Sequence, residues 1–324
     1  MQAPHFWQTD GLLPRLFSPA AWAYGIGVDL RRILAGEPSR LRVPIICVGN
    51  IVAGGAGKTP VARDLGARLC DKGKKPHFLT RGYGGLERGP LRVEVTRHSA
   101  VDVGDEALLL ARLCPTWVAA DRLAGCRAAV DDGAEVIVMD DGFQNPSVCK
   151  DVSLLVVDGE YGLGNQRLIP AGPMRERTAD ALKRADAVVV IGVDETGFRR
   201  HAENVGMPCL RADMKPEEPA EAFAVEPIIA FTGIGRPEKF FRTLREIGCD
   251  VQATHPYPDH FPFRNDEIKR LKEEARRNDA VLVTTEKDAA RIDPTARDGI
   301  EVLTITLQWE DEAALDDVLR TALN

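Results

Sequence analysis

Residues 43–59 read VPIICVGNIVAGGAGKT, and this stretch decides the fold class. It opens with a short apolar run rich in β-branched residues, which predicts a strand buried on both faces. A glycine-rich loop follows and ends at Gly57-Lys58-Thr59, where a helical pattern begins. Glycine lets backbone N–H groups turn inward around phosphate oxygens. Strand, loop and helix in this order therefore predict a phosphate-binding loop.

This loop offers a group for each part of a nucleoside triphosphate. Lys58 can reach the β- and γ-phosphates, and the Thr59 hydroxyl can bind Mg²⁺. The N-terminus of the following helix adds partial positive charge at the same point. The residues predicted to bind ATP are Val52, Ala53, Gly54, Gly55, Ala56, Gly57, Lys58 and Thr59.

The loop departs from the standard GxxxxGK[ST] pattern, because Val52 occupies the first glycine position. Gly54 and Gly55 supply the flexibility instead. A related loop, KGGxGKT, occurs in signal-recognition and partitioning ATPases, with a lysine where this chain has Ala53. A partitioning- or metallochaperone-type P-loop ATPase that acts as a switch is therefore an alternative, although the missing lysine counts against it. A second alternative is a non-enzymatic, membrane-bound nucleotide-binding module.

Beyond this loop, short apolar runs alternate with helical stretches. The alternation predicts an α/β fold with a P-loop-type, doubly wound, mostly parallel sheet. The expected strands are 43–48, 91–95, 135–139, 152–157 and 187–191, and the expected helices lie near 59–72, 104–114 and 121–132. A second, smaller α/β domain is expected from strands at 228–232, 250–253, 280–284 and 301–305 and helices near 237–247, 266–277 and 311–322.

The N-terminal segment differs in character from the rest of the chain. Trp22, Ile26, Leu30 and Ile33 fall on one face of a helix predicted over residues 19–34. The first 42 residues hold five arginines and three acidic residues, inside a chain of net charge −7. This pattern fits an amphipathic helix lying in a membrane interface. The alternative is a helix docked on the protein's own core.

We therefore predict a membrane-associating segment (1–42), a nucleotide-binding domain (43–193), a connector (194–226) and a smaller α/β lid domain (227–324). The connector is inferred from the run KPEEPAEAFAVEP, which is rich in proline, glutamate and alanine. The N-terminus lacks the features of a signal peptide, and its prolines and charges interrupt the roughly 20 apolar residues that a membrane span needs.

Composition excludes several classes of protein. A net charge of −7 and a pI of about 5.5 argue against a nucleic-acid binder. The seven cysteines are scattered and never form a CxxC pair. This spacing argues against a disulfide framework or a structural zinc site and favours a reducing compartment. No motif points to a protein partner.

Acidic residues follow a second predicted buried strand, in EVIVMDDGFQ (135–144). A P-loop enzyme keeps its Mg²⁺-organising carboxylate at such a strand end. Asp140 and Asp141 would repel each other unless a cation lay between them. The alternative is a strand-to-turn transition in which aspartate and Gly142 form the turn. With the phosphate loop upstream, the pattern favours the metal site.

Asp105 and Glu106 precede an apolar helix after Gly104. They can be first-turn acids that favour the helix dipole. Alternatively, Asp105 is a general base for a substrate hydroxyl and Glu106 a further Mg²⁺ ligand. His260 is a lone histidine between aromatic residues, and lone histidines are more often structural.

Two loops offer further polar groups. The glycine-rich loop TRGYGG (80–85) presents the guanidinium of Arg81 and the phenol of Tyr83. The loop LIPAGPMRER (168–177) presents Arg175 for an anion.

Taken together, the motifs resemble the tetraacyldisaccharide 4′-kinase family of lipid A biosynthesis. The segments that carry the resemblance are VGNIVAGGAGKTP (48–60), TRGYGG (80–85), VGDEALLL (103–110), DDGFQ (140–144), LIPAGPMRE (168–176), FTGIGRPEKFF (231–241), PDHFPF (258–263) and TTEKDA (284–289). Each motif is weak alone, but the ordered set is highly specific. The aromatic and basic N-terminus also resembles the membrane-associating start of that family.

The resemblance implies an Mg²⁺-dependent kinase that transfers the γ-phosphate of ATP to the 4′-hydroxyl of a tetraacylated disaccharide 1-phosphate. It also implies a peripheral location on the cytoplasmic face of the bacterial inner membrane. By motif, Lys58 and Thr59 would bind the phosphates and the metal, and Asp105 would be the base, helped by His260. The Mg²⁺ site would be formed by Glu106, Asp140 and Asp141. The polar head of the substrate would be contacted by Arg81, Tyr83 and Arg175. The family usually continues DDGFQ with histidine, whereas this chain has Asn145, which cannot carry a proton at neutral pH.

Overall fold

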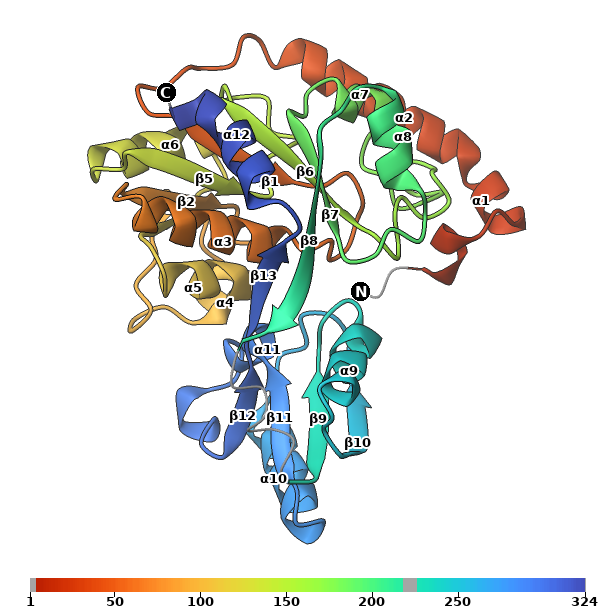
Figure 1. Cartoon of the computed structure of the whole chain (residues 1–324), viewed down its shortest axis with the longest axis vertical. Helices are drawn as coiled ribbons and strands as arrows, with labels where there is room; N and C mark the ends of the chain where they lie inside the picture. Colours follow the sequence, from red (N-terminus) through yellow and green to blue (C-terminus); the bar gives the residue numbers. More distant parts are fainter. Residues whose placement is uncertain (1–3, 218–225, 324) are drawn as a thin grey trace.

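The computed structural model describes residues 4–217 and 226–323 and divides them between a large and a small α/β domain (Figure 1). Nine strands of the described residues form the large sheet, in the order β13-β8-β7-β6-β1-β5-β2-β4-β3. They are β1 Ile45–Gly49, β2 Pro76–Thr80, β3 Leu91–Arg92, β4 Thr116–Val118, β5 Val136–Asp140, β6 Val152–Asp158, β7 Ala187–Ile191, β8 Cys209–Pro216 and β13 Ile305–Trp309. Only the β3–β4 and β8–β13 pairs are antiparallel. The prediction of a doubly wound, mostly parallel sheet is thus confirmed.

The central strands β1, β5, β6 and β7 are buried along their whole length, as their apolar composition predicts. Alternate residues of β5 face opposite layers: Val136 and Val138 pack in the cluster under α3, whereas Ile137 and Met139 pack with α6. The helices around this sheet are α3 Lys58–Asp71, α4 Ala100–Val103, α5 Asp105–Ala111, α6 Arg122–Asp131, α7 Thr178–Leu182, α8 Phe198–Asn204 and α12 Glu312–Leu323.

The small domain has a four-stranded parallel sheet within the described residues, in the order β10-β9-β11-β12. Its elements are β9 Ile228–Thr232, α9 Pro237–Glu246, β10 Val251–Pro256, α10 Asn265–Arg277, β11 Val281–Thr285, α11 Glu286–Ala289, a 3-10 turn Pro294–Ala296 and β12 Ile300–Leu303. The predicted strand–helix alternation of this region is confirmed.

The domain boundaries differ from the expected ones. Part of the segment expected to be a connector, 194–226, forms α8 and β8, and β8 pairs with β7 and with β13 in the large sheet. The end of the expected lid domain also returns to the large domain, as β13 and α12. These strands lack a continuous β-branched run, so their pairing is decided by long-range contacts. Residues 218–225 of the predicted connector lie outside the described residues.

One expected strand is also shorter than predicted. The run 91–95 contributes only the two residues of β3, which pairs antiparallel to β4 at the sheet edge. The expected helix over 104–114 ends early, at Ala111. In addition, the short helix α4 precedes Gly104, whose φ of +86° separates α4 from α5. A glycine is needed here because positive φ is strained for other residues.

The N-terminal segment forms a short 3-10 turn, His5–Gln8, and the helices α1 Leu12–Leu16 and α2 Ser18–Leu34, which lie along the large domain (Figure 1). Ala21 and Gly25 are buried on the inner face of α2. A Cβ on Gly25 would approach Leu168 Cδ1 to 2.9 Å, so the helix packs closely there. Arg32 pairs with the buried carboxylate of Glu176 at 2.6 Å. The expectation of a helix docked on the core is therefore correct for this face.

The outer face of α2 is apolar and exposed. Trp22 is 68% exposed, Leu30 52% and Ile33 77%, and Ile26 lies beside them. Soluble domains rarely turn such a stripe toward water without a partner. None of the helices within residues 4–217 and 226–323 has the length and apolar character needed to cross a bilayer.

Candidate active site at the domain junction

The predicted phosphate loop joins β1 to α3 in the structure. Gly57 adopts a φ of +91° and caps the first turn of α3, at Lys58. Glycine is favoured at this position because a φ of +91° is strained for residues that carry a Cβ. Gly54 and Gly55 face open space, since a Cβ on either would meet no atom within 4 Å. Within the described residues, the N–H groups of Gly54 and Gly55 donate no hydrogen bond, so both are available beside the positive end of a helix, which is an anion-binding arrangement.

The departure at Val52 has a structural reason. Val52 is buried and forms a β-bridge with Met174 in the loop that follows β6. The N–H of Ala53 donates to Pro173 O at 2.8 Å, and the N–H of Arg175 donates to Ile51 O at 2.7 Å. The start of the phosphate loop is thus held by a second segment of the chain. A glycine at position 52 would lose the packing of the Val52 side chain.

Two carboxylates at the end of β5 face the first turn of α3. Thr59 Oγ1 donates to Asp140 Oδ2 at 2.8 Å, and Lys58 Nζ lies 3.7 Å from Asp141 Oδ1. Arg175 Nη1 donates to Asp141 at 3.0 Å. Asp141 adopts a φ of +56°, a strained conformation that is commoner at functional sites. The structure therefore brings together the predicted phosphate-binding and metal-binding groups.

The electrostatics of this carboxylate pair favour a cation. Burial raises the pKa of Asp140 to about 7, and the nearby Glu106 carboxylate adds to the rise. Burial would also raise the pKa of Asp141, but Lys58 and Arg175 outweigh it and lower that pKa. Asp140 Oδ1 is buried and has no hydrogen-bond partner among the described residues. That free oxygen fits an Mg²⁺ ligand.

No group of three His, Cys, Asp or Glu side chains within the described residues is arranged to hold a metal by itself. Mg²⁺ is usually bound by one or two carboxylates together with water and substrate phosphates. The free oxygen of Asp140, beside Thr59 of the phosphate loop, fits such a site.

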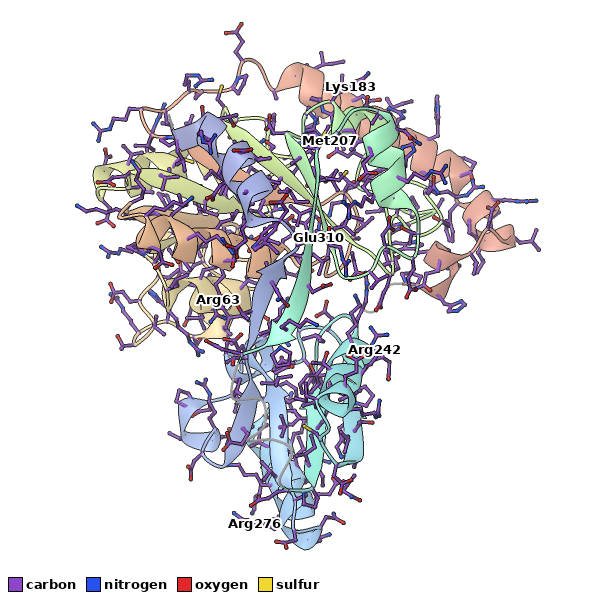
Figure 2. The ribbon with its side chains drawn as sticks, in the orientation of Figure 1. Arg63, Lys183, Met207, Arg242, Arg276 and Glu310 are labelled. Carbon is purple, nitrogen blue, oxygen red and sulfur yellow. The ribbon has the colours of Figure 1, made fainter. Side chains whose placement is uncertain are left out.

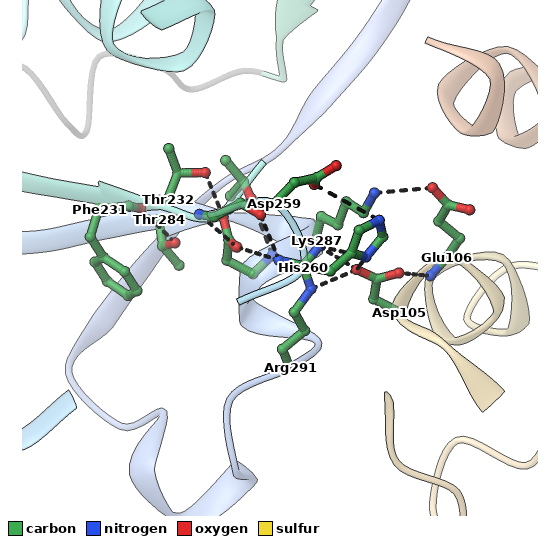
Figure 3. A network of polar contacts seen from close by, with 12 residues as sticks. Asp105, Glu106, Phe231, Thr232, Asp259, His260, Thr284, Lys287 and Arg291 are labelled. Carbon is green, nitrogen blue, oxygen red and sulfur yellow. Dashed lines mark hydrogen bonds and ion pairs between the residues drawn. The ribbon is translucent and has the colours of Figure 1, made fainter. Parts of the chain in front are cut away.

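Asp105 and His260 meet across the domain junction (Figure 3). Asp105 begins α5 of the large domain, and His260 lies in the loop after β10 of the small domain. His260 Nδ1 is 3.1 Å from Asp105 Oδ2. His260 is held at a φ of +58°, with its N–H donating to Gly233 O at 3.0 Å. The ring is therefore positioned by the small domain.

The charge of Asp105 is strongly stabilised. Burial would raise the pKa of this carboxyl, but the hydrogen bond to His260 and the charges of Lys287 and Arg291 outweigh burial and hold the pKa well below its usual range. Lys287 Nζ also lies 3.0 Å from Glu106 Oε1, so both acids of the first turn of α5 contact the small domain. The simple helix-dipole interpretation does not account for these contacts.

The other predicted site residues differ in how close they lie to the Asp105–His260 pair and in the contacts they make. Tyr83 is exposed and its ring lies 5.2 Å from the ring of His260, beside the predicted acid–base pair. Arg81 is exposed and makes no hydrogen bond or ion pair within the residues that the structure describes. Asn145 Oδ1 accepts hydrogen bonds from the N–H and the hydroxyl of Ser147, so its side chain stabilises a local turn.

Several charged residues at the junction had no predicted role. Asp158, at the end of β6, is buried and pairs with Arg236 at 2.7 Å and with Lys239 at 2.6 Å, both from the small domain. Arg63 of α3 pairs with Glu286 of α11 at 2.7 Å. In Figure 2, Arg63 lies on the junction side of the large domain. The motif GRPEKFF contains two of these cations, but only the fold reveals their partner.

A glycine loop between a buried strand and a helix, with carboxylates at the end of the neighbouring strand, defines a P-loop protein of the α/β class. The sequence model of the family described as tetraacyldisaccharide-1-P 4′-kinase matches residues 13–324. The chain belongs to this family.

Individual relatives agree with this assignment. A tetraacyldisaccharide 4′-kinase of Paramagnetospirillum magneticum is 50% identical over 315 residues, which cover 97% of each chain. A protein of the same name from Gluconacetobacter diazotrophicus is 50% identical over 321 residues, covering 98% of this chain and 97% of the relative. The crystal structure of LpxK from Aquifex aeolicus in complex with ATP is similar with a TM-score of 0.78 and 26% identity, covering 97% of this chain and 100% of that chain.

Proposed function

We propose that this chain transfers the γ-phosphate of ATP to the 4′-hydroxyl of tetraacyldisaccharide 1-phosphate in lipid A biosynthesis. The observation that carries the proposal is a chain of contacts at the domain junction. Thr59 of the phosphate loop donates to Asp140, the Glu106 carboxylate lies near enough to act on the pKa of Asp140, and the adjacent Asp105 contacts His260 of the small domain. Membership of the family and the names of the relatives support the choice of substrate.

In this proposal, residues 52–59 hold the triphosphate of ATP. Lys58 neutralises charge on the β- and γ-phosphates, and the backbone N–H groups around Gly55 and Gly57 orient their oxygens. Phosphoryl transfer needs positioning and charge neutralisation more than covalent help from the protein. The open backbone at Gly54 and Gly55 supports this role.

When bound, Mg²⁺ supplies charge neutralisation on the transferring phosphoryl group. Thr59, Glu106, Asp140 and Asp141 would hold it. The free Oδ1 of Asp140 supports a cation at this place, and so does the pKa of Asp140, which is raised by burial and, to a lesser extent, by the Glu106 carboxylate.

The acceptor oxygen of the 4′-hydroxyl attacks the γ-phosphorus, and the bond from that phosphorus to the ADP oxygen breaks. The hydroxyl proton passes to the Asp105–His260 pair, because a carboxylate and an imidazole in contact can accept a proton. Arg81, Tyr83 and Arg175 would contact the polar head of the lipid. The exposure of Arg81 and Tyr83 beside the junction supports this assignment.

We further propose that the small domain acts as a lid over the nucleotide. Its ion pairs to Asp105, Glu106 and Asp158 form only when the two domains are together. Closure would complete the acid–base pair and exclude water, which limits hydrolysis of ATP.

The exposed face of α2 would bind the membrane, on the cytoplasmic side of the inner membrane. Its apolar stripe suits the boundary between head groups and acyl chains, and nearby arginines such as Arg31 suit anionic lipids. A substrate whose acyl chains remain in the bilayer requires an enzyme held at that surface.

The test is transfer of labelled phosphate from ATP to a lipid extract that contains the tetraacyldisaccharide 1-phosphate, by the purified full chain with Mg²⁺. A labelled lipid that carries a new 4′-phosphate supports the proposal. ATP hydrolysis without lipid labelling would instead indicate a P-loop ATPase that acts as a switch, and ATP binding with no turnover would indicate a nucleotide-binding module.

A further inference from the structure

A buried arginine of the small domain holds the Asp105 carboxylate (Figure 3). The Arg291 side chain is only 5% exposed, and its Nε donates to Asp105 Oδ2 at 2.6 Å. Its Nη1 donates to Gly233 O at 2.8 Å and to Asp288 Oδ1 at 2.9 Å. Arg291 follows α11 and lies just beyond the TTEKDA motif, and nothing in the sequence pattern marked it.

The small domain fixes this guanidinium by itself. Asp288 is fully buried, and its carboxylate accepts hydrogen bonds from Thr232 Oγ1 at 2.6 Å, from the Gly233 N–H at 3.0 Å and from Thr285 Oγ1 at 2.7 Å. A carboxylate held by three donors cannot move without losing them. Arg291 is therefore presented to the large domain in one orientation.

The position of Arg291 determines which tautomer of His260 is favoured. A guanidinium can only donate, so Asp105 Oδ2 is the acceptor for Arg291. His260 Nδ1 lies closer to that oxygen, at 3.1 Å, than to Arg291 Nη2, at 3.4 Å. The imidazole is best satisfied when its Nδ1–H donates to Asp105, and this tautomer leaves a lone pair on Nε2.

We infer that Arg291 is a positioning residue, which fixes the Asp105 carboxylate and through it the tautomer and direction of His260. The inference rests on the proposed kinase function. Arg291 acts only when the small domain meets the large one, so it also links closure to assembly of the acid–base pair.

The test compares three variants of the full chain in the phosphate-transfer assay. Arg291→Gln should lower kcat about 100-fold while the KM for ATP stays within about twofold, because a misdirected acid–base pair affects the reaction and not nucleotide binding. Arg291→Lys should recover about tenfold, since lysine keeps the charge but not the fork of donors. Arg276→Gln is the matched control, because Arg276 is exposed at the far end of the small domain (Figure 2) and should leave kcat unchanged.

Two results would overturn the inference. One is a wild-type kcat in Arg291→Gln. The other is loss of ATP binding and of cooperative thermal unfolding in both Arg291 variants, which would make the residue structural. If the wild-type chain transfers no phosphate, the proposed function itself is wrong and the inference falls with it.

An independent observation concerns two thiols outside the site. Cys70 lies in the last turn of α3 and Cys114 lies after α5, and their Sγ atoms are 3.3 Å apart. Bonded sulfurs are about 2.0 Å apart, so a small shift would join them. Cys70 is exposed, whereas Cys114 is buried and burial raises the pKa of its thiol to about 12.

We propose that Cys70 and Cys114 are a reversible disulfide site that responds to small-molecule disulfides. The Cys70 thiolate attacks such a molecule and releases one thiol, which leaves a mixed disulfide on Cys70. The Cys114 thiolate then displaces the second thiol. The two protein thiols are oxidised, the small disulfide is reduced to two thiols, and two protons pass to them. In a reducing compartment both cysteines remain thiols.

Oxidised glutathione added to the full chain tests this site. We expect an intact mass lower by two hydrogens, a linked peptide pair containing Cys70 and Cys114, and an unfolding midpoint higher by several degrees, because the closed loop constrains the unfolded chain. Cys114→Ser should stop at one glutathione on Cys70, and Cys149→Ser, at a partly exposed cysteine, is the matched control that should still form the link. A stable mixed disulfide on the wild-type chain, or no reaction, would overturn the proposal.

Discussion

The apolar face of α2 allows a quantitative prediction about membrane binding. Trp22 is 68% exposed and Ile33 is 77% exposed. Fully burying a large apolar side chain is worth about 1.5–3 kcal/mol, and roughly two thirds of that remains to be gained at each of these residues. Changing both to serine should therefore weaken membrane binding by about 2–4 kcal/mol, which corresponds to a partition coefficient about 30- to 1000-fold lower.

Vesicle sedimentation measures this change. The full chain is mixed with vesicles of neutral and anionic phospholipids, and the bound fraction is followed against lipid concentration. The matched control is a double variant, Leu86→Ser with Val205→Ser, at residues that are 73% and 60% exposed on other parts of the surface. The control should bind as the wild type does.

The helix itself should remain in place in the Trp22 and Ile33 variant. Arg32 pairs with Glu176, and Gly25 packs against Leu168 on the opposite face of α2. Helical content and the unfolding midpoint should therefore stay close to wild type. Vesicle binding that is unchanged in the double variant would refute the assignment of this face to the membrane.

Three further predictions concern the site. Lys58→Ala should lower turnover about 100- to 1000-fold without unfolding the chain, and near-normal activity would remove the phosphate-loop assignment. Asp105→Ala should reduce kcat more than ATP affinity, and the reverse pattern would make Asp105 a nucleotide or metal ligand. Because the pKa of Asp140 is raised to about 7, its carboxylate is mostly ionised at pH 8 and mostly protonated at pH 6. The Mg²⁺ concentration for half-maximal activity should rise up to about tenfold on that acidification, and Asp140→Asn should abolish this part of the pH dependence.

Much of the large domain was predictable because its signals are local. The buried strands β1, β5, β6 and β7 follow from short runs of β-branched residues, and their predicted bounds lie within two residues of those observed. The loop that ends at Lys58 follows from glycines within a few positions of a strand and a helix. The family resemblance rests on motifs in order, and the family match over residues 13–324 confirms it.

The course of the chain between the domains was not predictable in this way. β8 and β13 pair across about a hundred residues, and neither has the continuous apolar run of a central strand. Their assignment to a connector and to the small domain was wrong for this reason. No sequence motif predicts the ion pairs that Asp158 forms with Arg236 and Lys239. These residues meet only because the two domains pack together.

By itself, the sequence determined the strand–loop–helix unit around Lys58, the alternation of strands and helices, and the family. These depend on residues that are neighbours along the chain. The family resemblance implied that His260 helps Asp105, 155 residues earlier, but only the tertiary structure showed how they meet and that Arg291, 186 residues after Asp105, joins them. Contacts at such separations depend on how whole domains pack, and no local pattern of residues specifies that packing.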